Sequence, residues 1–271
     1  MPELPEVEVT RQGLIPLLKK RISKVDVRNY SLRWPIDNNL EKILKGQELL
    51  QLDRRAKYIL AKFTNGTLII HLGMSGHLCI MPINSQVKKH DHVDFTFGND
   101  GPILRYTDPR RFGSILWTKD NPMDHKLLCK LGPEPLNQNF NDEYLYRILK
   151  RKQQYIKSVI MDSNIVVGIG NIYASEALFY AGIKPQRRAH KVSKKETQIL
   201  VKFIKEVINN AIKKGGSTMS DFFDVNGENG YFQNEHKVYG REGLCCLTCQ
   251  SVIKQKRIGQ RSSFFCSECQ K

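Results

Sequence analysis

The chain has 271 residues and a formal charge of +16, from 43 Lys and Arg against 27 Asp and Glu. Apolar residues make up 40% of it, which suffices for a folded core and excludes a largely disordered basic chain. No run approaches the ~18 consecutive apolar residues that a membrane span requires, and the acidic start lacks the pattern of a signal peptide. We therefore expect a cytoplasmic protein of two domains with a small appendage.

The positive charge predicts a polyanionic partner, because Lys and Arg that neutralise phosphates release condensed counterions. Nucleic acid is the first candidate, and the alternative is a charge that only keeps the protein soluble. Seven cysteines is an odd count, which disfavours a disulfide framework and indicates a reducing compartment.

The N-terminal part of the chain predicts one helix followed by strands. Residues 5–20 have the prolines and acidic side chains that suit a helix start. Four short segments rich in β-branched or alternating apolar residues follow, separated by turn signals: 49–52, 58–63, 68–72 and 92–97. Strands at this close spacing predict a sandwich or barrel.

The pattern changes after a proline-rich linker at residues 131–135. Helices are predicted from Asn141 to about 151, over 171–180 and over 193–214, the last opening with a capping box. The Gly-, Ser- and Asn-rich residues 215–230 predict a mobile loop. A cysteine-rich module ends the chain.

Two C-x2-C pairs in this module predict a metal site. Cys246 and Cys249 form one pair and Cys266 and Cys269 the other, with 16 residues between them. Two such knuckles joined by a hairpin present four thiolates in the tetrahedral arrangement of a structural Zn²⁺. Cys245 could compete as a ligand, but Cys246 alone gives matched spacing. We expect Cys79 and Cys129 to be small buried residues.

Basic residues concentrate between the two cysteine pairs. Residues 254–261 contain four cations, and the module from Lys237 to Lys271 has seven Lys or Arg and two Asp or Glu, a net charge of +5. A β-ribbon with this charge can enter a groove or lie along phosphates. The alternative is a solvated charged turn.

The N-terminus has the residues for amine nucleophilic chemistry. Removal of Met1 before Pro2 would leave a secondary amine, which at an ordinary α-amino pKa of ~7.7–8.0 is partly neutral at physiological pH. Attack of such an amine on a sugar C1′ gives a permanently cationic iminium. From the residues alone, an ordinary helix start is the simpler explanation of this segment.

Six motifs in chain order, together with the cysteine module, make the sequence resemble the bacterial formamidopyrimidine-DNA glycosylases over essentially its whole length. They are PELPEVE at 2–8, RRAKY at 54–58, HLGMSG at 71–76, KHDHV at 89–93, DPRRFG at 108–113 and GIGNIYA at 168–174.

The resemblance implies an α+β fold with three parts. These are an N-terminal β-sandwich domain with a leading helix (1–131), a helix-two-turn-helix domain with a lesion-capping loop at 217–231 (132–236), and a β-hairpin zinc finger (237–271). It also implies a monomeric base-excision-repair enzyme, acting on duplex DNA that contains oxidised purines or abasic sites.

The catalytic roles that the resemblance implies begin at the N-terminus. Pro2 would displace the base and form the Schiff base, Glu3 would protonate the deoxyribose ring oxygen, and Glu6 would hold the N-terminus. Lys57 and Arg261 would bind phosphate and assist β- and δ-elimination. A carboxylate suits the cationic sugar and cations suit the expelled phosphates.

A second group of residues is implied in DNA binding. Met74, Arg110 and Phe112 match the trio that fills the gap left by an extruded nucleotide. His90, Lys152 and Asn171 match backbone contacts, with Lys152 in doubt because residues 150 and 151 are also basic. Without the resemblance, Met74 and Phe112 would more simply be core residues.

Two rival functions remain open from the sequence. Endonuclease VIII shares the architecture and prefers oxidised pyrimidines, although Leu4 and the trio around Met74 favour the purine-specific branch. A non-catalytic zinc-finger DNA-binding protein would not need Pro2.

Overall fold

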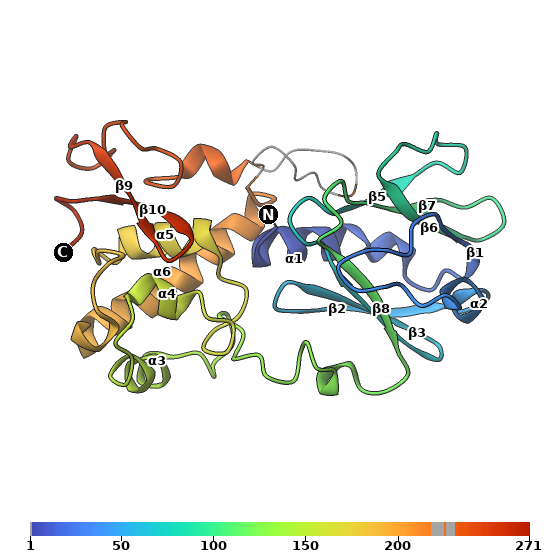
Figure 1. The fold of residues 1–271 in the computed structure, drawn as a ribbon, viewed down its shortest axis with the longest axis horizontal. Coiled ribbons are helices and arrows are strands. Elements are labelled where there is room, and N and C mark those ends of the chain that lie inside the picture. The colour runs from blue at the N-terminus through green and yellow to red at the C-terminus, as the bar shows by residue number, and fades with distance from the viewer. Residues whose placement is uncertain (1, 218–224, 226–230) are drawn as a thin grey trace. The chain divides into compact units, whose positions relative to one another are not determined.

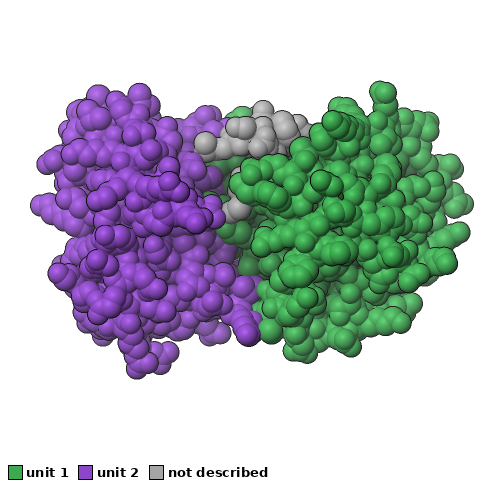
Figure 2. Space-filling view, in the orientation of Figure 1, with its two compact units in different colours: residues 1–129, 214–231 green, residues 130–213, 232–271 purple. Residues whose placement is uncertain are grey.

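The structure is a computed structural model that describes residues 2–217, 225 and 231–271. The chain divides into two compact units, residues 1–129 with 214–231 and residues 130–213 with 232–271 (Figure 2). Within the described residues, no helix is both long and apolar enough to cross a membrane. Most of the expected capping loop, 218–224 and 226–230, lies outside the described residues.

The first unit is a β-sandwich. One antiparallel sheet has the order β1-β6-β7-β5 and the other β2-β3-β4-β8 (Figure 1). Apolar side chains of both sheets, Leu68 and Phe95 among them, share one buried cluster, which confirms the predicted sandwich. The strands are β1 (Ile22–Val27), β2 (Leu49–Arg55), β3 (Tyr58–Phe63), β4 (Gly66–His71), β5 (His77–Met81), β6 (Asp91–Phe97), β7 (Ile103–Thr107) and β8 (Ser114–Thr118).

The leading helix is shorter than the sequence predicted. Helix α1 covers Leu4–Gly13 and a 3₁₀ turn, η1, covers Ile15–Leu17, so the expected continuous helix to residue 20 is wrong. Pro16 explains the break, because proline has no amide proton to donate and its ring clashes with the preceding turn of a helix. Two short elements complete this unit: α2 (Leu40–Leu44) and η2 (Pro122–Asp124).

The second unit contains the remaining helices and the cysteine module. Asn141 caps the first helix by accepting a hydrogen bond from the amide of Tyr144, and Ser193 and Glu196 form the predicted capping box. The elements are α3 (Asp142–Leu149), α4 (Ile156–Ile160), α5 (Asn171–Tyr180), η3 (Ala189–Lys191), α6 (Lys194–Lys213), η4 (Phe232–Glu235), β9 (Ile253–Ile258) and β10 (Arg261–Cys266).

The β9–β10 hairpin packs on the end of α5. Phe179 of α5 shares a small buried cluster with Val238, Ile253 and the cysteines 246 and 266. The C-terminus is tied to the turn after α5, because the amide of Lys271 donates to the carbonyl of Gly182 at 2.9 Å. The cysteine module is therefore part of the same compact body as the helices.

Candidate functional site

Helix α1 begins at a cluster of buried acidic residues. Pro2 is buried, and Glu3 and Glu6 are only 2% and 1% exposed. Glu6 Oε2 accepts the amide proton of Glu3, and its Oε1 accepts that of Ser217, each at 2.8 Å. A carboxylate at this end is stabilised by the helix dipole. Glu6 thus links the start of the chain to residue 217, whose sequence separation gave no sign of this contact.

Lys57 lies in the tight turn between β2 and β3, next to Ala56, which has a positive φ of 55°. Burial and the charges of Lys57 and Arg33 lower the pKa of His71, at the end of β4, to about 4. The His71 ring lies 4.7 Å from that of Tyr58, and its Nδ1 accepts the amide proton of Gly73. His71 is therefore neutral at physiological pH.

This pKa predicts a loss of stability in mild acid. An unfolded chain protonates His71 as the pH falls below its ordinary pKa of 6.5, whereas the native ring stays neutral until about 4. The native state should lose up to about 3 kcal/mol between these values, at about 1.4 kcal/mol per pKa unit. The free energy of unfolding is measured by urea denaturation at several pH values for wild type and for His71→Asn, which keeps an acceptor for the Gly73 amide. The two free energies should converge as the pH falls toward 4. Curves that stay parallel would contradict the assignment.

Two connections of the first unit carry Met74, Arg110 and Phe112. The β4–β5 connection (72–76) contains Met74, and the β7–β8 connection (108–113) contains Arg110 and Phe112. Phe112 is 44% exposed, and the guanidinium carbon of Arg110 lies 5.0 Å above the centre of its ring. The connections touch at Gly73, where an added Cβ would lie 2.4 Å from the amide nitrogen of Gly113. Phe112 is therefore an exposed aromatic side chain on a rigidly packed support, and the interpretation of it as a core residue is wrong.

The second unit holds Lys152, Asn171 and Arg261. Asn171 begins α5, and its side chain accepts a hydrogen bond from Lys157 Nζ at 2.7 Å and donates to the carbonyl of Ser262 at 2.9 Å. Lys157, 1% exposed, also donates to that carbonyl and to Ser263 Oγ. Asn171 and the hairpin residue Arg261 are thus held on one scaffold, while Lys152 lies in the turn after α3.

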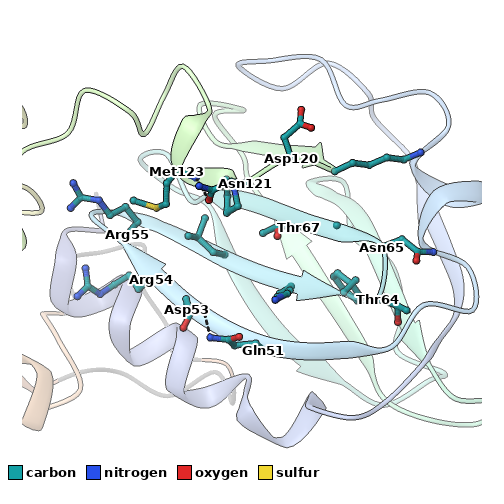
Figure 3. A pocket seen from close by; sticks show the side chains of 16 residues that line it. Gln51, Asp53, Arg54, Arg55, Thr64, Asn65, Thr67, Asp120, Asn121 and Met123 are labelled. Atoms are coloured by element: carbon teal, nitrogen blue, oxygen red, sulfur yellow. Dashed lines mark hydrogen bonds between the residues drawn. The ribbon is translucent and has the colours of Figure 1, made fainter.

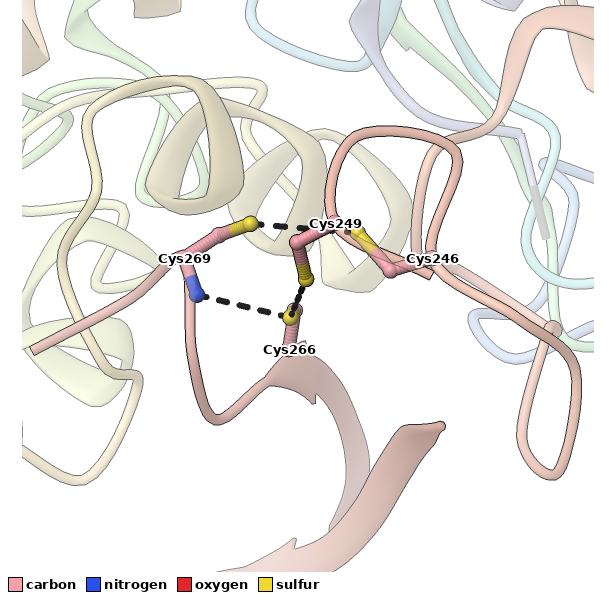
Figure 4. A group of neighbouring side chains, drawn as sticks. All are labelled: Cys246, Cys249, Cys266 and Cys269. Atoms are coloured by element: carbon pink, nitrogen blue, oxygen red, sulfur yellow. Dashed lines mark hydrogen bonds between the residues drawn. The ribbon is translucent and has the colours of Figure 1, made fainter. Parts of the chain in front are cut away.

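The four cysteines of the two C-x2-C pairs converge, with all four sulfur atoms within 4.8 Å of one another (Figure 4). Zn²⁺ with ~2.3 Å bonds at tetrahedral angles places sulfurs ~3.8 Å apart, close to the 3.4 Å and 3.9 Å found for two of the pairs. Backbone amides of Thr248 and Cys269 point at the ligand sulfurs. The group can therefore hold a metal ion. Cys245 and Cys129 are exposed, so the expectation of a buried Cys129 is wrong, and Cys79 is only half-buried.

A separate hollow of about 910 Å³ lies over the β2–β3–β4–β8 sheet, where Gln51 and Asp53 are hydrogen-bonded (Figure 3). The described residues that line it include Arg54, Arg55 and Met123 but none of the predicted site residues.

Comparison with known proteins covers the whole chain. Two domain families match: the formamidopyrimidine-DNA glycosylase N-terminal domain at residues 1–115 and its H2TH domain at 131–223. Formamidopyrimidine-DNA glycosylases of Psychromonas ingrahamii and Methylobacillus flagellatus are 51% and 49% identical, over all of this chain and 100% and 96% of theirs. The chain belongs to the formamidopyrimidine-DNA glycosylase family. It is thus a DNA glycosylase of base excision repair, in a family that includes lyase activity.

Solved structures agree with this membership. The Thermus thermophilus family member has a TM-score of 0.89 at 34% identity, covering 99% of this chain and 98% of that one. The Lactococcus lactis glycosylase, solved in complex with abasic-site DNA, has a TM-score of 0.92 at 30% identity and 99% coverage of both chains.

Sequence reasoning missed several buried polar residues of this glycosylase. In the sequence, Lys157 and Glu176 cannot be told from the many exposed lysines and glutamates. In the structure, the Glu176 carboxylate accepts hydrogen bonds from the backbone amides of residues 237–239. Burial raises the pKa of Glu176, while those amides oppose the rise. Asp108 begins the DPRRFG motif, in which the resemblance implies roles only for Arg110 and Phe112. No periodicity marks such residues, because their partners are distant in sequence.

Proposed function

We propose that this glycosylase removes oxidised purines, namely 8-oxoguanine and formamidopyrimidines, from duplex DNA and then cleaves the strand at the resulting abasic site. The observation that carries the proposed chemistry is the buried N-terminal arrangement of Pro2 and of Glu3, which is the N-cap residue of α1 and has its amide fixed by Glu6. The Lactococcus lactis relative has been crystallised with DNA containing an abasic site or a Fapy-dG lesion. Duplex DNA of this kind is the proposed substrate here.

The proposed reaction begins once Met1 has been removed. The Pro2 nitrogen bonds to the sugar C1′ while the bond from C1′ to the base breaks, and that electron pair leaves with the base. The proline nitrogen gives its proton to the departing base, which frees an electron pair on the nitrogen. Glu3 gives a proton to the ring oxygen, the bond from C1′ to that oxygen breaks, and the nitrogen pair forms the iminium. Loss of a C2′ proton then breaks the C3′–O bond and expels the 3′ phosphate, and loss of a C4′ proton breaks the C5′–O bond and expels the 5′ phosphate.

Other residues are proposed to assist the two eliminations and to hold the DNA. Lys57 assists β-elimination and Arg261 δ-elimination, since positive charge stabilises an expelled phosphate. Met74 and Phe112 fill the gap left by the extruded nucleotide, and Arg110 pairs with the opposite cytosine. His90, Lys152 and Asn171 bind the DNA backbone.

The cysteine cluster is proposed to hold one Zn²⁺ through Cys246, Cys249, Cys266 and Cys269. The donor set supports this, because four thiolates in a closed arrangement are the ligands of a structural zinc. The ion supplies no chemistry to the reaction. It fixes the base of the β9–β10 hairpin, from whose tip Arg261 extends.

We further propose a monomer in the cytoplasm, organised as a catalytic domain (1–131), a helix-two-turn-helix domain (132–236) and a zinc finger (237–271). The thiolate ligands of the proposed zinc site support a reducing compartment such as the cytoplasm.

Competition between lesions tests the substrate class. Equal amounts of duplex with 8-oxoguanine opposite cytosine and duplex with thymine glycol are incubated with the enzyme, and the products are separated by size. We expect faster cleavage of the 8-oxoguanine strand. Faster cleavage of thymine glycol would instead indicate an endonuclease VIII specificity, and release of neither base would indicate a non-catalytic DNA-binding protein.

A further inference from the structure

Asp108 begins the β7–β8 connection that carries Arg110 and Phe112, and its buried carboxylate contacts the β4–β5 connection that carries Met74. It is 0% exposed, and its oxygens accept hydrogen bonds from Ser75 Oγ at 2.8 Å, the Gly113 amide at 2.9 Å and the Tyr106 hydroxyl at 3.2 Å. Burying a carboxylate costs folding free energy unless hydrogen-bond donors such as these contact its oxygens.

Ser75 is the direct link between the two connections. Its hydroxyl donates to Asp108 and at the same time accepts the amide proton of Arg110 at 3.2 Å. It is 5% exposed, so water cannot easily replace either bond. One hydroxyl therefore joins the residue after Met74 to the backbone that carries Arg110.

The backbone of Asp108 reaches a third segment, the one that carries His90. The Asp108 amide donates to the carbonyl of His90 at 3.1 Å, and its carbonyl lies 2.8 Å from Nε2 of the buried His92. The residues around Asp108 are tightly packed, because an added Cβ on Gly113 would lie 1.8 Å from the Tyr106 hydroxyl oxygen. Three segments far apart in the sequence thus meet at one residue.

We propose that Asp108, acting through Ser75, is a positioning residue that makes the Met74 and Arg110–Phe112 connections move as one block. This rests on the proposed function, in which those side chains enter the duplex when the damaged nucleotide is extruded. If the two connections are fixed to each other, Met74, Arg110 and Phe112 enter the gap in the duplex in a single step. If the connections move independently, each must lose its conformational freedom during extrusion. The hydrogen bond between Ser75 and Asp108 therefore assists extrusion of the nucleotide and has no part in the chemistry at C1′.

The test is Ser75→Ala, which removes the link and leaves the Gly113 and Tyr106 bonds to Asp108. We expect 8-oxoguanine excision from duplex DNA to fall ~10–100-fold, the range for small misplacements of a positioned group. Cleavage at an abasic site in single-stranded DNA, which needs no extrusion, should be unchanged. A 2-aminopurine beside the lesion should brighten more slowly on mixing with the variant.

Matched variants separate positioning from folding. Ser75→Thr, which keeps the hydroxyl, should restore duplex excision, and Ser23→Ala, which removes a hydroxyl bonded to the Thr96 carbonyl in the same unit, should behave as wild type. Equal loss on both substrates, or unchanged duplex excision and fluorescence, would overturn the proposal. Wild type that releases no base from the duplex would instead refute the proposed function, and this inference with it.

Discussion

Replacing Glu3 with glutamine is expected to lower the release of 8-oxoguanine from duplex DNA by about a thousand-fold, within the ~10²–10⁴-fold contribution of a positioned general acid. Glu3 is 2% exposed at the N-cap of α1, where its amide is held by Glu6. Glutamine keeps the shape but has no proton to give to the sugar ring oxygen. The measurement is single-turnover base release, with enzyme in excess over labelled duplex.

The same variant should still cleave a preformed abasic site, because that sugar opens to an aldehyde without help and Pro2 can form its iminium directly. Glu8→Gln is a matched control: Glu8 lies on the same helix, paired with Arg11 and Arg54, outside the proposed chemistry. Equal loss of both activities in Glu3→Gln would mean that the substitution disturbs the N-terminus as a whole. Full base release would remove Glu3 from the mechanism.

Loss of the metal is expected to have the second largest effect, lowering the affinity for lesion-containing DNA at least ~100-fold. The hairpin packs into only a small apolar cluster shared with Phe179 of α5, whereas zinc binding in small fingers contributes ~10–16 kcal/mol to folding. Without the ion, Arg261 and the cations of β9 lose their common support. Fluorescence anisotropy with labelled duplex, before and after chelation with metal content measured, gives the result.

Cysteine variants identify the ligands independently of the chelator. Cys249→Ser should reproduce the loss of affinity and of bound zinc, while Cys245→Ser and Cys129→Ser, which remove exposed thiols outside the cluster, should retain both. Full affinity in protein proven to be free of metal would require the structural role of the cluster to be abandoned.

Local signals predicted the parts of this protein that depend on neighbouring residues. The spacing of the cysteines predicted their convergence, and Asn141 and Ser193 marked helix starts because capping is a short-range interaction. Pro16 carried the signal for the end of α1, which the prediction overlooked. Strands β1, β5, β7 and β8 were not predicted.

The site itself depends on contacts that no local pattern can show. Glu6 meets Ser217 across 211 residues, and Lys157 meets Ser263 across 106. A buried lysine or carboxylate looks in sequence like the many exposed ones, since burial is a property of the folded chain. Family resemblance named the residues proposed to touch DNA, and the structure adds the residues that hold them in place.

The central claim is that Pro2 is the nucleophile, and borohydride trapping tests it most directly. Enzyme whose loss of Met1 has been verified by intact mass is mixed with 8-oxoguanine duplex and sodium borohydride, and the adduct is digested and sequenced by mass spectrometry. We predict one covalent adduct, with the reduced sugar on the Pro2 nitrogen. An adduct on a lysine such as Lys57, or no adduct while the base is still released, would contradict the account.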